Sequence, residues 1–369
     1  MKNSILVLGA GNVGLLVASL LSDTQDYTVY LGDIQKPSEL PDIEKNPIQF
    51  VLCNIDQQKD LIALIKKYEI QTVVSCLPFQ QTEKVAELAA SCQLNYFDLT
   101  EDVEMTTKVS GLAEKSQHVF APQCGLAPGF ISVVASYLMK PFDKLGRIKL
   151  RVGALPLNVS NPLNYALTWS TPGLINEYIN PCAAIVDYKK AFVQALDNLE
   201  EIKLDGLTYE AFNTSGGVGS LVDTYEGKVR HMDYKSVRYP GHCEKMRFLL
   251  QGLKLSEDPE KIYEILENAV PKTASDVVLV YVSVQGIKDD VSLEHNYAEK
   301  FYPVDLFGRK WTAIQMTTAS SLCVAIDLVV VEKKYKGPLL KQEQINFKED
   351  FLPNRFGQYF QREESQEGL

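Results

Sequence analysis

Short apolar segments alternate with amphipathic segments along the first third of the chain. Runs that are apolar throughout are typical of strands buried on both faces of a parallel sheet. The pattern predicts strands at Ser4–Leu8, Thr28–Gly32, Ile48–Leu52, Thr72–Leu77, Tyr96–Leu99 and His118–Ala121. It predicts helices at Val13–Ser22, Asp56–Tyr68, Thr82–Cys92 and Val103–Gln117. This alternation predicts an α/β fold built on a doubly wound parallel sheet.

The pattern changes after about Pro128, where one more helix is followed by longer and more polar strands. The helix is expected at Gly129–Met139, and the strands at Arg147–Leu155, Tyr165–Trp169, Ile185–Asp187, Thr208–Phe212 and Asp276–Gln285. Polar positions within strands indicate a mixed or antiparallel sheet with one solvent-exposed face. The long apolar segment Trp311–Val330 is expected to be a buried helix rather than a membrane span, because Asp327 would be costly in lipid.

Length, charge and cysteine usage narrow the class of protein. A chain of 369 residues suggests two domains. The net charge of −10 argues against a nucleic-acid partner, because such proteins usually present a basic face. The seven cysteines show no CxxC spacing, so we expect no metal site and a reducing compartment, the cytoplasm.

A glycine-rich loop follows the first predicted strand and opens the first predicted helix. Its residues are Gly9, Ala10, Gly11, Asn12, Val13 and Gly14, a GxGxxG pattern. In the Rossmann-type arrangement the first glycine makes the turn, the second admits a pyrophosphate and the third lets helix and strand pack closely. The helix N-terminus then attracts the phosphates. The loop predicts binding of a nicotinamide dinucleotide.

An acidic residue, Asp33, ends the second predicted strand. A carboxylate there accepts hydrogen bonds from the adenosine ribose and repels a 2′-phosphate. This favours NAD, and NADP is the alternative because Lys36 lies three residues further on.

Three more strand ends should meet at the same edge of the sheet, where ligands of such folds bind. Each of these segments could instead serve only as a turn. The candidate cofactor contacts at these ends are Asn54 and Ile55, then Cys76, Leu77 and Pro78, and finally Thr100.

Six sequence motifs together resemble the saccharopine dehydrogenase family, in the reductase branch that includes lysine 6-dehydrogenases. The motif at 238–246 (RYPGHCEKM) is the most specific of them. The others lie at 7–11, 75–79, 96–100, 124–129 and, in two parts, 168–170 and 174–178. Fungal-type saccharopine reductases typically carry Asp after Cys-Gly-Leu, whereas this chain has Ala127. That departure favours the lysine 6-dehydrogenase-like members.

The resemblance implies a domain organisation and an assembly. Residues 1–128 would form the dinucleotide-binding domain. Residues 129–305 would form an inserted α+β domain for substrate binding and dimerisation, and residues 306–369 would return to the first domain. It also implies a homodimer formed largely through the inserted sheet.

The activity implied is NAD(P)-dependent oxidation at the CH–NH group of a small amino-acid substrate, most like lysine 6-dehydrogenase. Hydride leaves the carbon bearing the terminal amine, and the resulting imine is hydrolysed or cyclises. Two alternatives stay open. One is a reductase of saccharopine or carboxynorspermidine dehydrogenase type, which joins an aldehyde to an amine. The other is a nicotinamide-binding regulator without turnover.

Three residues are candidates for the chemistry. Arg238 suits bidentate recognition of a carboxylate, or else makes a salt bridge. His242 titrates near neutrality and is a candidate base, or else a structural residue at a helix start. Glu177 is a candidate contact for the substrate amine, or else lies on a helix. A second glycine-rich segment, 214–217, is expected to be a tight turn near the substrate.

Overall fold

The computed structural model describes residues 2–41, 43 and 46–361, and its first sheet is fully parallel. The strand order is β3-β2-β1-β4-β5-β6, which reverses direction between β1 and β4. The strands are β1 (Asn3–Leu8), β2 (Tyr27–Asp33), β3 (Gln49–Leu52), β4 (Thr72–Ser75), β5 (Asn95–Asp98) and β6 (Phe120–Ala121). The helices between them are α1 (Asn12–Ser22), α2 (Gln58–Lys67), α3 (Thr82–Cys92) and α4 (Val103–Ala113). The predicted α/β doubly wound fold is confirmed.

The side chains of β1 alternate between two hydrophobic cores because successive residues of a strand point to opposite faces. Ile5 and Val7 belong to the core shared with α1, whereas Leu6 and Leu8 belong to the core shared with α2 and α3. Both sets are almost completely buried. This two-sided burial explains why the strand is an unbroken apolar run.

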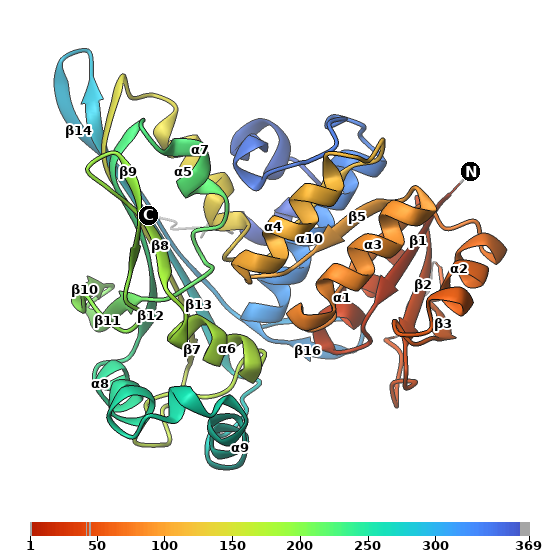
Figure 1. Cartoon of the computed structure of the whole chain (residues 1–369), viewed down its shortest axis with the longest axis horizontal. Coiled ribbons are helices and arrows are strands. Elements are labelled where there is room, and N and C mark those ends of the chain that lie inside the picture. Colours follow the sequence, from red (N-terminus) through yellow and green to blue (C-terminus); the bar gives the residue numbers. More distant parts are fainter. Residues whose placement is uncertain (1, 42, 44–45, 362–369) are drawn as a thin grey trace, which may run out of the picture.

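The second sheet has eight strands and is mixed (Figure 1). Its central strands β7 and β12 are parallel, and its other neighbouring pairs are antiparallel. The strands are β7 (Lys144–Pro156), β8 (Cys182–Val186), β9 (Lys189–Val193), β10 (Glu200–Leu204), β11 (Leu207–Asn213), β12 (Val229–Arg238), β13 (Asp276–Lys288) and β14 (Val291–Phe301). A separate pair consists of β15 (Val304–Leu306) and β16 (Arg309–Trp311).

Helices connect and cover the two sheets. The long helix α10 (Ala313–Val330) packs against α1 on one side and against β13 on the other, so it lies between the sheets (Figure 1). It is apolar and long enough to cross a membrane, yet most of it is buried inside the protein. The remaining helices are α5 (Phe130–Met139), α6 (Thr171–Ile179), α7 (Leu221–Tyr225), α8 (His242–Arg247) and α9 (Pro259–Ala269).

One prediction about the second half of the chain was wrong, and β9, β10, β12 and β14 were not predicted. Residues 165–169 form no strand but an irregular segment with one isolated bridge, between Leu167 and Lys272. The reason is local, because Ser170 caps α6 by accepting a hydrogen bond from Gly173 N. The strand β12 was not predicted, because polar side chains such as Asp233 and Lys235 interrupt its apolar pattern.

A buried carboxylate joins the C-terminal segment to the first sheet. Asp327 of α10 accepts hydrogen bonds from Tyr27 Oη (2.8 Å) and from Asn354 Nδ2 (2.9 Å). Arg355 donates to both of its oxygens and also pairs with Asp26. Because Asp327 is almost completely buried, Arg355 supplies the counter-charge that makes this burial possible.

Replacing Arg355 with Met should destabilise the protein, because it leaves the buried charge of Asp327 without a cation. The expected loss in the free energy of unfolding is on the order of 2–3 kcal/mol, measured by denaturant or thermal unfolding. A matched control is Lys84→Met, which breaks the exposed Lys84–Asp56 pair and should cost less than about 1 kcal/mol. Equal losses in the two variants would contradict the role given to Arg355.

Candidate active site

A large cavity lies between the carboxyl edge of the first sheet and one face of the second sheet. Its volume is about 610 Å³. The first sheet contributes the glycine-rich loop and the ends of β4 and β5. The second sheet contributes Tyr234, Ser236 and Arg238 of β12, and α6 contributes Glu177. Ligands of doubly wound folds bind at this edge, so the cavity joins a cofactor side to a substrate side.

The glycine-rich loop is packed too tightly for larger residues at two positions. A Cβ atom on Gly14 would lie 1.8 Å from the carbonyl oxygen of Gly9, and one on Gly9 would lie 2.7 Å from the carbonyl oxygen of Cys76. Next to Gly11, by contrast, no atom lies within 4 Å of a Cβ position. No side chain caps the N-terminus of α1, so its N–H groups are available to an anion. This cradle fits the pyrophosphate of NAD(P), with Asn12 and Val13 also lining the cavity.

Asp33 lies directly against the glycine-rich loop. Its Oδ2 accepts a hydrogen bond from the backbone N–H of Ala10 at 2.6 Å, and its Oδ1 accepts one from Gln35 N at 3.3 Å. The carboxylate therefore stands beside the turn that would hold the pyrophosphate, the position from which an acid can reach an adenosine ribose.

The other predicted cofactor residues divide into two groups. Cys76, Leu77, Pro78 and Thr100 line the cavity, as do Gly11 and Gly14. Asn54 and Ile55 do not line it. The Asn54 side chain accepts a hydrogen bond from Asp56 N within a turn, and Ile55 is packed in the core beside α2.

Arg238 reaches the cavity from the end of β12 and is almost completely buried. Its Nε donates to Tyr178 Oη (3.0 Å), and one terminal nitrogen donates to the carbonyl of Val237 (2.8 Å). The guanidinium carbon also lies 5.1 Å from the centre of the Tyr165 ring. These contacts fix the guanidinium and leave further N–H donors for a ligand, since arginine has five.

His242 lies behind Arg238 rather than in the cavity. Its Nδ1 donates to the carbonyl of Leu163 (2.8 Å), so its Nε2 accepts from Tyr178 Oη (3.1 Å). Burial, and next the positive charge of Arg238, lowers the pKa of His242 to about 3. The ring is thus neutral and both nitrogens are in use. The structure does not place His242 where a base would contact a substrate, which corrects the role predicted for it.

Glu177 projects from α6 into the cavity. It is almost completely buried, and its backbone carbonyl accepts a hydrogen bond from Ser215 N (2.9 Å). Burial raises the pKa of its carboxyl to about 8, with Arg238 opposing the shift and Glu101 adding to it. Among the described residues no ion pair within 4 Å joins Glu177 to Arg238, although both line the cavity.

A second carboxyl in the cavity, that of Glu101, was not found by sequence reasoning. It directly follows Thr100 at the end of β5, and burial raises its pKa to about 7. The turn at 214–217 packs against it, because a Cβ on Gly216 would lie 2.4 Å from the carbonyl oxygen of Glu101. The position of Glu101 beside a predicted strand end was the available signal.

The substrate side of the cavity therefore holds a fixed guanidinium and two carboxyl groups that burial keeps partly protonated. A ligand carrying both an amine and a carboxylate would satisfy both kinds of group. Proton acceptors with pKa values near neutrality are suited to general base catalysis.

Two family models match consecutive parts of the chain. The saccharopine dehydrogenase NADP-binding domain matches residues 5–121, and the saccharopine dehydrogenase C-terminal domain matches residues 125–352. Mitochondrial alpha-aminoadipic semialdehyde synthase of Rattus norvegicus is 23% identical over 198 residues, which cover 51% of this chain and 21% of that protein. The chain thus matches only about a fifth of the length of this curated relative.

Solved structures show the same fold at low sequence identity. Saccharopine dehydrogenase (L-Glu forming) from Saccharomyces cerevisiae has a TM-score of 0.72 and 15% identity, and the match covers 93% of this chain and 94% of that one. A homospermidine synthase from Legionella pneumophila in complex with NAD has a TM-score of 0.66 and 13% identity, with 94% and 87% covered.

Replacing Glu177 with Gln should stabilise the protein, and more so at high pH. With a pKa of about 8 in the folded state and an ordinary pKa when unfolded, the carboxyl takes up a proton on folding between these values. Its contribution therefore becomes less favourable as pH rises towards 8. We expect thermal unfolding to show a gain of roughly 2 °C or more at pH 9, and a smaller gain at pH 6.

The control for this prediction is Glu87→Gln, which neutralises an exposed carboxylate of α3. It should leave the unfolding temperature nearly unchanged at both pH values. A gain for Glu177→Gln that does not grow with pH would show that desolvation of this carboxyl is not the cause.

Proposed function

The chain belongs to the saccharopine dehydrogenase family, a family of NAD(P)-binding oxidoreductases, and we propose that it oxidises the terminal amine of an amino acid, as lysine 6-dehydrogenases do. The observation that carries the proposal is the pairing of an unneutralised guanidinium, Arg238, with two carboxyl groups, the half-buried Glu101 and the buried Glu177, in one cavity. This set of charges complements a substrate that carries a carboxylate at one end and an amine at the other.

The roles follow from the position of each group. Arg238 binds the substrate carboxylate through its free N–H donors. Glu177, once ionised, accepts a proton from the substrate ammonium, and Glu101 adds negative potential beside it. NAD(P)⁺, when bound with its pyrophosphate at the glycine-rich loop and the N-terminus of α1, would supply the hydride acceptor. Loss of hydride from the carbon bearing the amine yields an imine, which water hydrolyses or which cyclises.

His242 acts on this chemistry through Tyr178. The chain of hydrogen bonds from Arg238 to Tyr178, to His242 and to the carbonyl of Leu163 holds the guanidinium in one orientation. His242 is thus a positioning residue, and Glu177 takes the part of the base.

A second candidate function is a reductase that joins an aldehyde to an amine. It is supported by the extent of the cavity, which reaches past Trp169 to Tyr263, Glu267 and Lys272 near α9. This outer part offers room and both signs of charge to a second reactant. The fold shared with a saccharopine dehydrogenase and a homospermidine synthase is compatible with either reaction.

Cofactor preference, assembly and location complete the proposal. Asp33 beside the glycine-rich loop favours NAD over NADP. We also propose a homodimer formed through the second sheet, as the family resemblance implies. All seven cysteines are free thiols, which suits the cytoplasm.

Purified protein should reduce NAD when supplied with L-lysine, followed by the absorbance of reduced nicotinamide. The rate, as kcat/KM, should rise with pH through a value near 8, because the base must lose its proton and the pKa of Glu177 is about 8. Glu177→Gln should lower kcat/KM by about 10²-fold or more and remove this pH dependence. Activity only in the reductive direction, with an aldehyde plus an amine, would favour the second candidate. Cofactor binding without turnover would favour a regulator.

Substrate comparison tests the role of Arg238. If its guanidinium binds the carboxylate, 1,5-diaminopentane should be used with a KM at least about tenfold above that of L-lysine. Arg238→Lys should raise KM for lysine and narrow this difference, since an ammonium cannot form the bidentate contact. Equal use of the two substrates by the unaltered protein would remove Arg238 from the carboxylate site.

Replacing Asp33 with Ala should weaken NAD binding by about tenfold, because the ribose loses a charged acceptor. Binding of NADP should change less, so the preference for NAD should shrink. Titration of protein fluorescence with each cofactor measures both constants. Unchanged NAD affinity would refute the contact between Asp33 and the ribose.

A further inference from the structure

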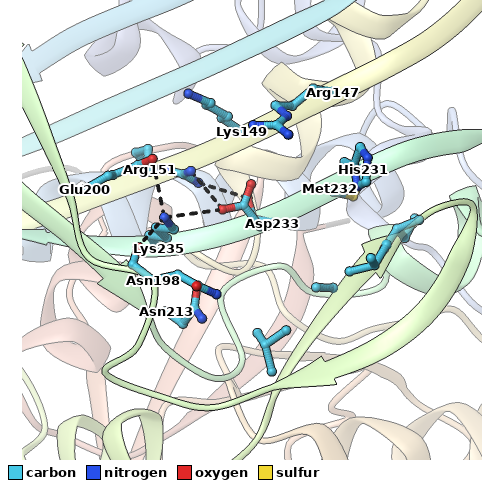
Figure 2. Close-up of a pocket in the computed structure, with 14 residues that line it drawn as sticks. Arg147, Lys149, Arg151, Asn198, Glu200, Asn213, His231, Met232, Asp233 and Lys235 are labelled. Carbon is cyan, nitrogen blue, oxygen red and sulfur yellow. Dashed lines mark hydrogen bonds and ion pairs between the residues drawn. The ribbon is translucent and has the colours of Figure 1, made fainter.

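A second cavity lies on the opposite face of the eight-stranded sheet, away from the proposed active site (Figure 2). Its volume is about 350 Å³, within the range of small-ligand sites. It lies where the strand β12 changes its pairing partner. The strand β12 pairs with β8 at residues 231–232 and with β11 at residues 235–238. The cavity lies beside the gap between these two partners.

Most of the charged groups that line this cavity are positive. Alternate residues of β7, namely Arg147, Lys149 and Arg151, point to the same face, and Lys235 joins them from β12. Only two acidic residues, Glu200 and Asp233, lie among them. This concentration of positive charge stands out in a chain whose net charge is −10.

The two acidic residues are already neutralised by the two most buried cations. Arg151 pairs with Glu200 at 2.5 Å and with Asp233 at 2.8 Å. Lys235 lies 3.3 Å from Glu200 and donates to the carbonyl of Asn198. Arg151 and Lys235 are both more than nine-tenths buried. These four side chains form a closed network at the floor of the cavity.

Arg147 and Lys149 take no part in this network. In Figure 2 the dashed lines join Arg151, Lys235, Glu200 and Asp233, and none reaches Arg147 or Lys149. Neither residue has a hydrogen bond or an ion pair within 4 Å to another residue of the described chain. His231 also lines the cavity, and its Nε2 lies 3.5 Å from Asp187. Lys149 interacts electrostatically, without direct contact, with Glu200 and Glu294. Arg147 is exposed, and both cations add positive potential above the neutral floor.

We propose that this cavity is a binding site for a small oxyanion carrying two or more negative charges, of the phosphate-ester or polycarboxylate kind. Arg147 and Lys149 supply the unneutralised charge, and the Arg151–Lys235 network holds the floor rigid. Guanidinium and ammonium groups together suit an anion with several oxygens. The size of the cavity limits the ligand to a small molecule.

The site is separate from the one proposed for the reaction, and it is built on the same strand. Along β12, Asp233 and Lys235 face the second cavity, whereas Tyr234 and Ser236 face the active-site cavity. Successive residues of a strand point to opposite faces, so one layer of sheet separates the two ligands. The proposed anion site does not depend on which reaction the protein catalyses.

The test is binding of two probes, inorganic pyrophosphate and citrate, to the full chain saturated with NAD. Saturation occupies the glycine-rich loop, so any further binding occurs elsewhere. Isothermal titration calorimetry at low and high salt should show one saturable site for at least one probe, weakened by salt. Preference for pyrophosphate would identify a phosphorylated compound as the ligand type, and preference for citrate a polycarboxylate.

Three variants locate the site. Lys149→Gln and Arg147→Gln should each weaken binding about tenfold or more, the effect of losing one charge-assisted contact. Lys144→Gln removes the same charge from the same strand but does not line the cavity, so it should leave binding almost unchanged. Near-ultraviolet circular dichroism checks that each variant is folded.

Two results would overturn the proposal. One is the absence of saturable binding of either probe at low salt. The other is an equal loss of affinity in Lys149→Gln and Lys144→Gln, which would mean that only the overall charge matters.

Discussion

Burial of the Arg238 guanidinium is the constraint on which the substrate side of this protein depends. A buried cation is tolerated only when its donors are used and its charge is compensated. Arg238 meets this requirement only in part, through Tyr178, the carbonyl of Val237 and the ring of Tyr165; its other donors and its charge are left for a ligand. The hydrogen bonds continue to His242 and Leu163. They tie β12, α6, α8 and the segment before α6 into one unit, so the position of Glu177 is fixed by the same contacts.

This arrangement leaves two carboxyl groups in an unfavourable environment. Among the residues that the structure describes, no cation forms an ion pair with Glu101 or Glu177, and burial raises the pKa of each well above its ordinary value. Without a ligand, the protein would be more stable with neutral residues at these two positions. A bound ligand with an amine stabilises the ionised carboxyl groups, because it supplies the missing positive charge. The two carboxyl groups thus lower the folding stability of the free protein and favour binding of an amine.

The second sheet serves two different surfaces because strand residues alternate in direction. The inward residues of β7 and β12 belong to the core that also contains α10, or line the active-site cavity. On the outward face, Arg147, Lys149 and Arg151 of β7 and Asp233 and Lys235 of β12 are charged. The outward charges are not distributed evenly. Arg151 and Lys235 are neutralised by Glu200 and Asp233, and Arg147 and Lys149 are not. A strand with charged residues on one face and cavity-lining polar residues on the other lacks the simple alternation of apolar and polar residues that is typical of a half-buried strand.

Local sequence pattern determined the first half of the fold and the cofactor side of the site. Apolar runs, the glycine spacing and Asp33 at a strand end each act within a few residues, so they could be interpreted before the tertiary structure was known. Tertiary structure alone decided that Glu101 joins Glu177, and that His242 supports Tyr178 instead of facing the cavity. It also decided that residues 165–169 form no strand. The physical reason is that burial depends on which distant segments pack together. Burial in turn determines the pKa values and the hydrogen bonds, and the spacing of residues along the chain does not indicate these tertiary contacts.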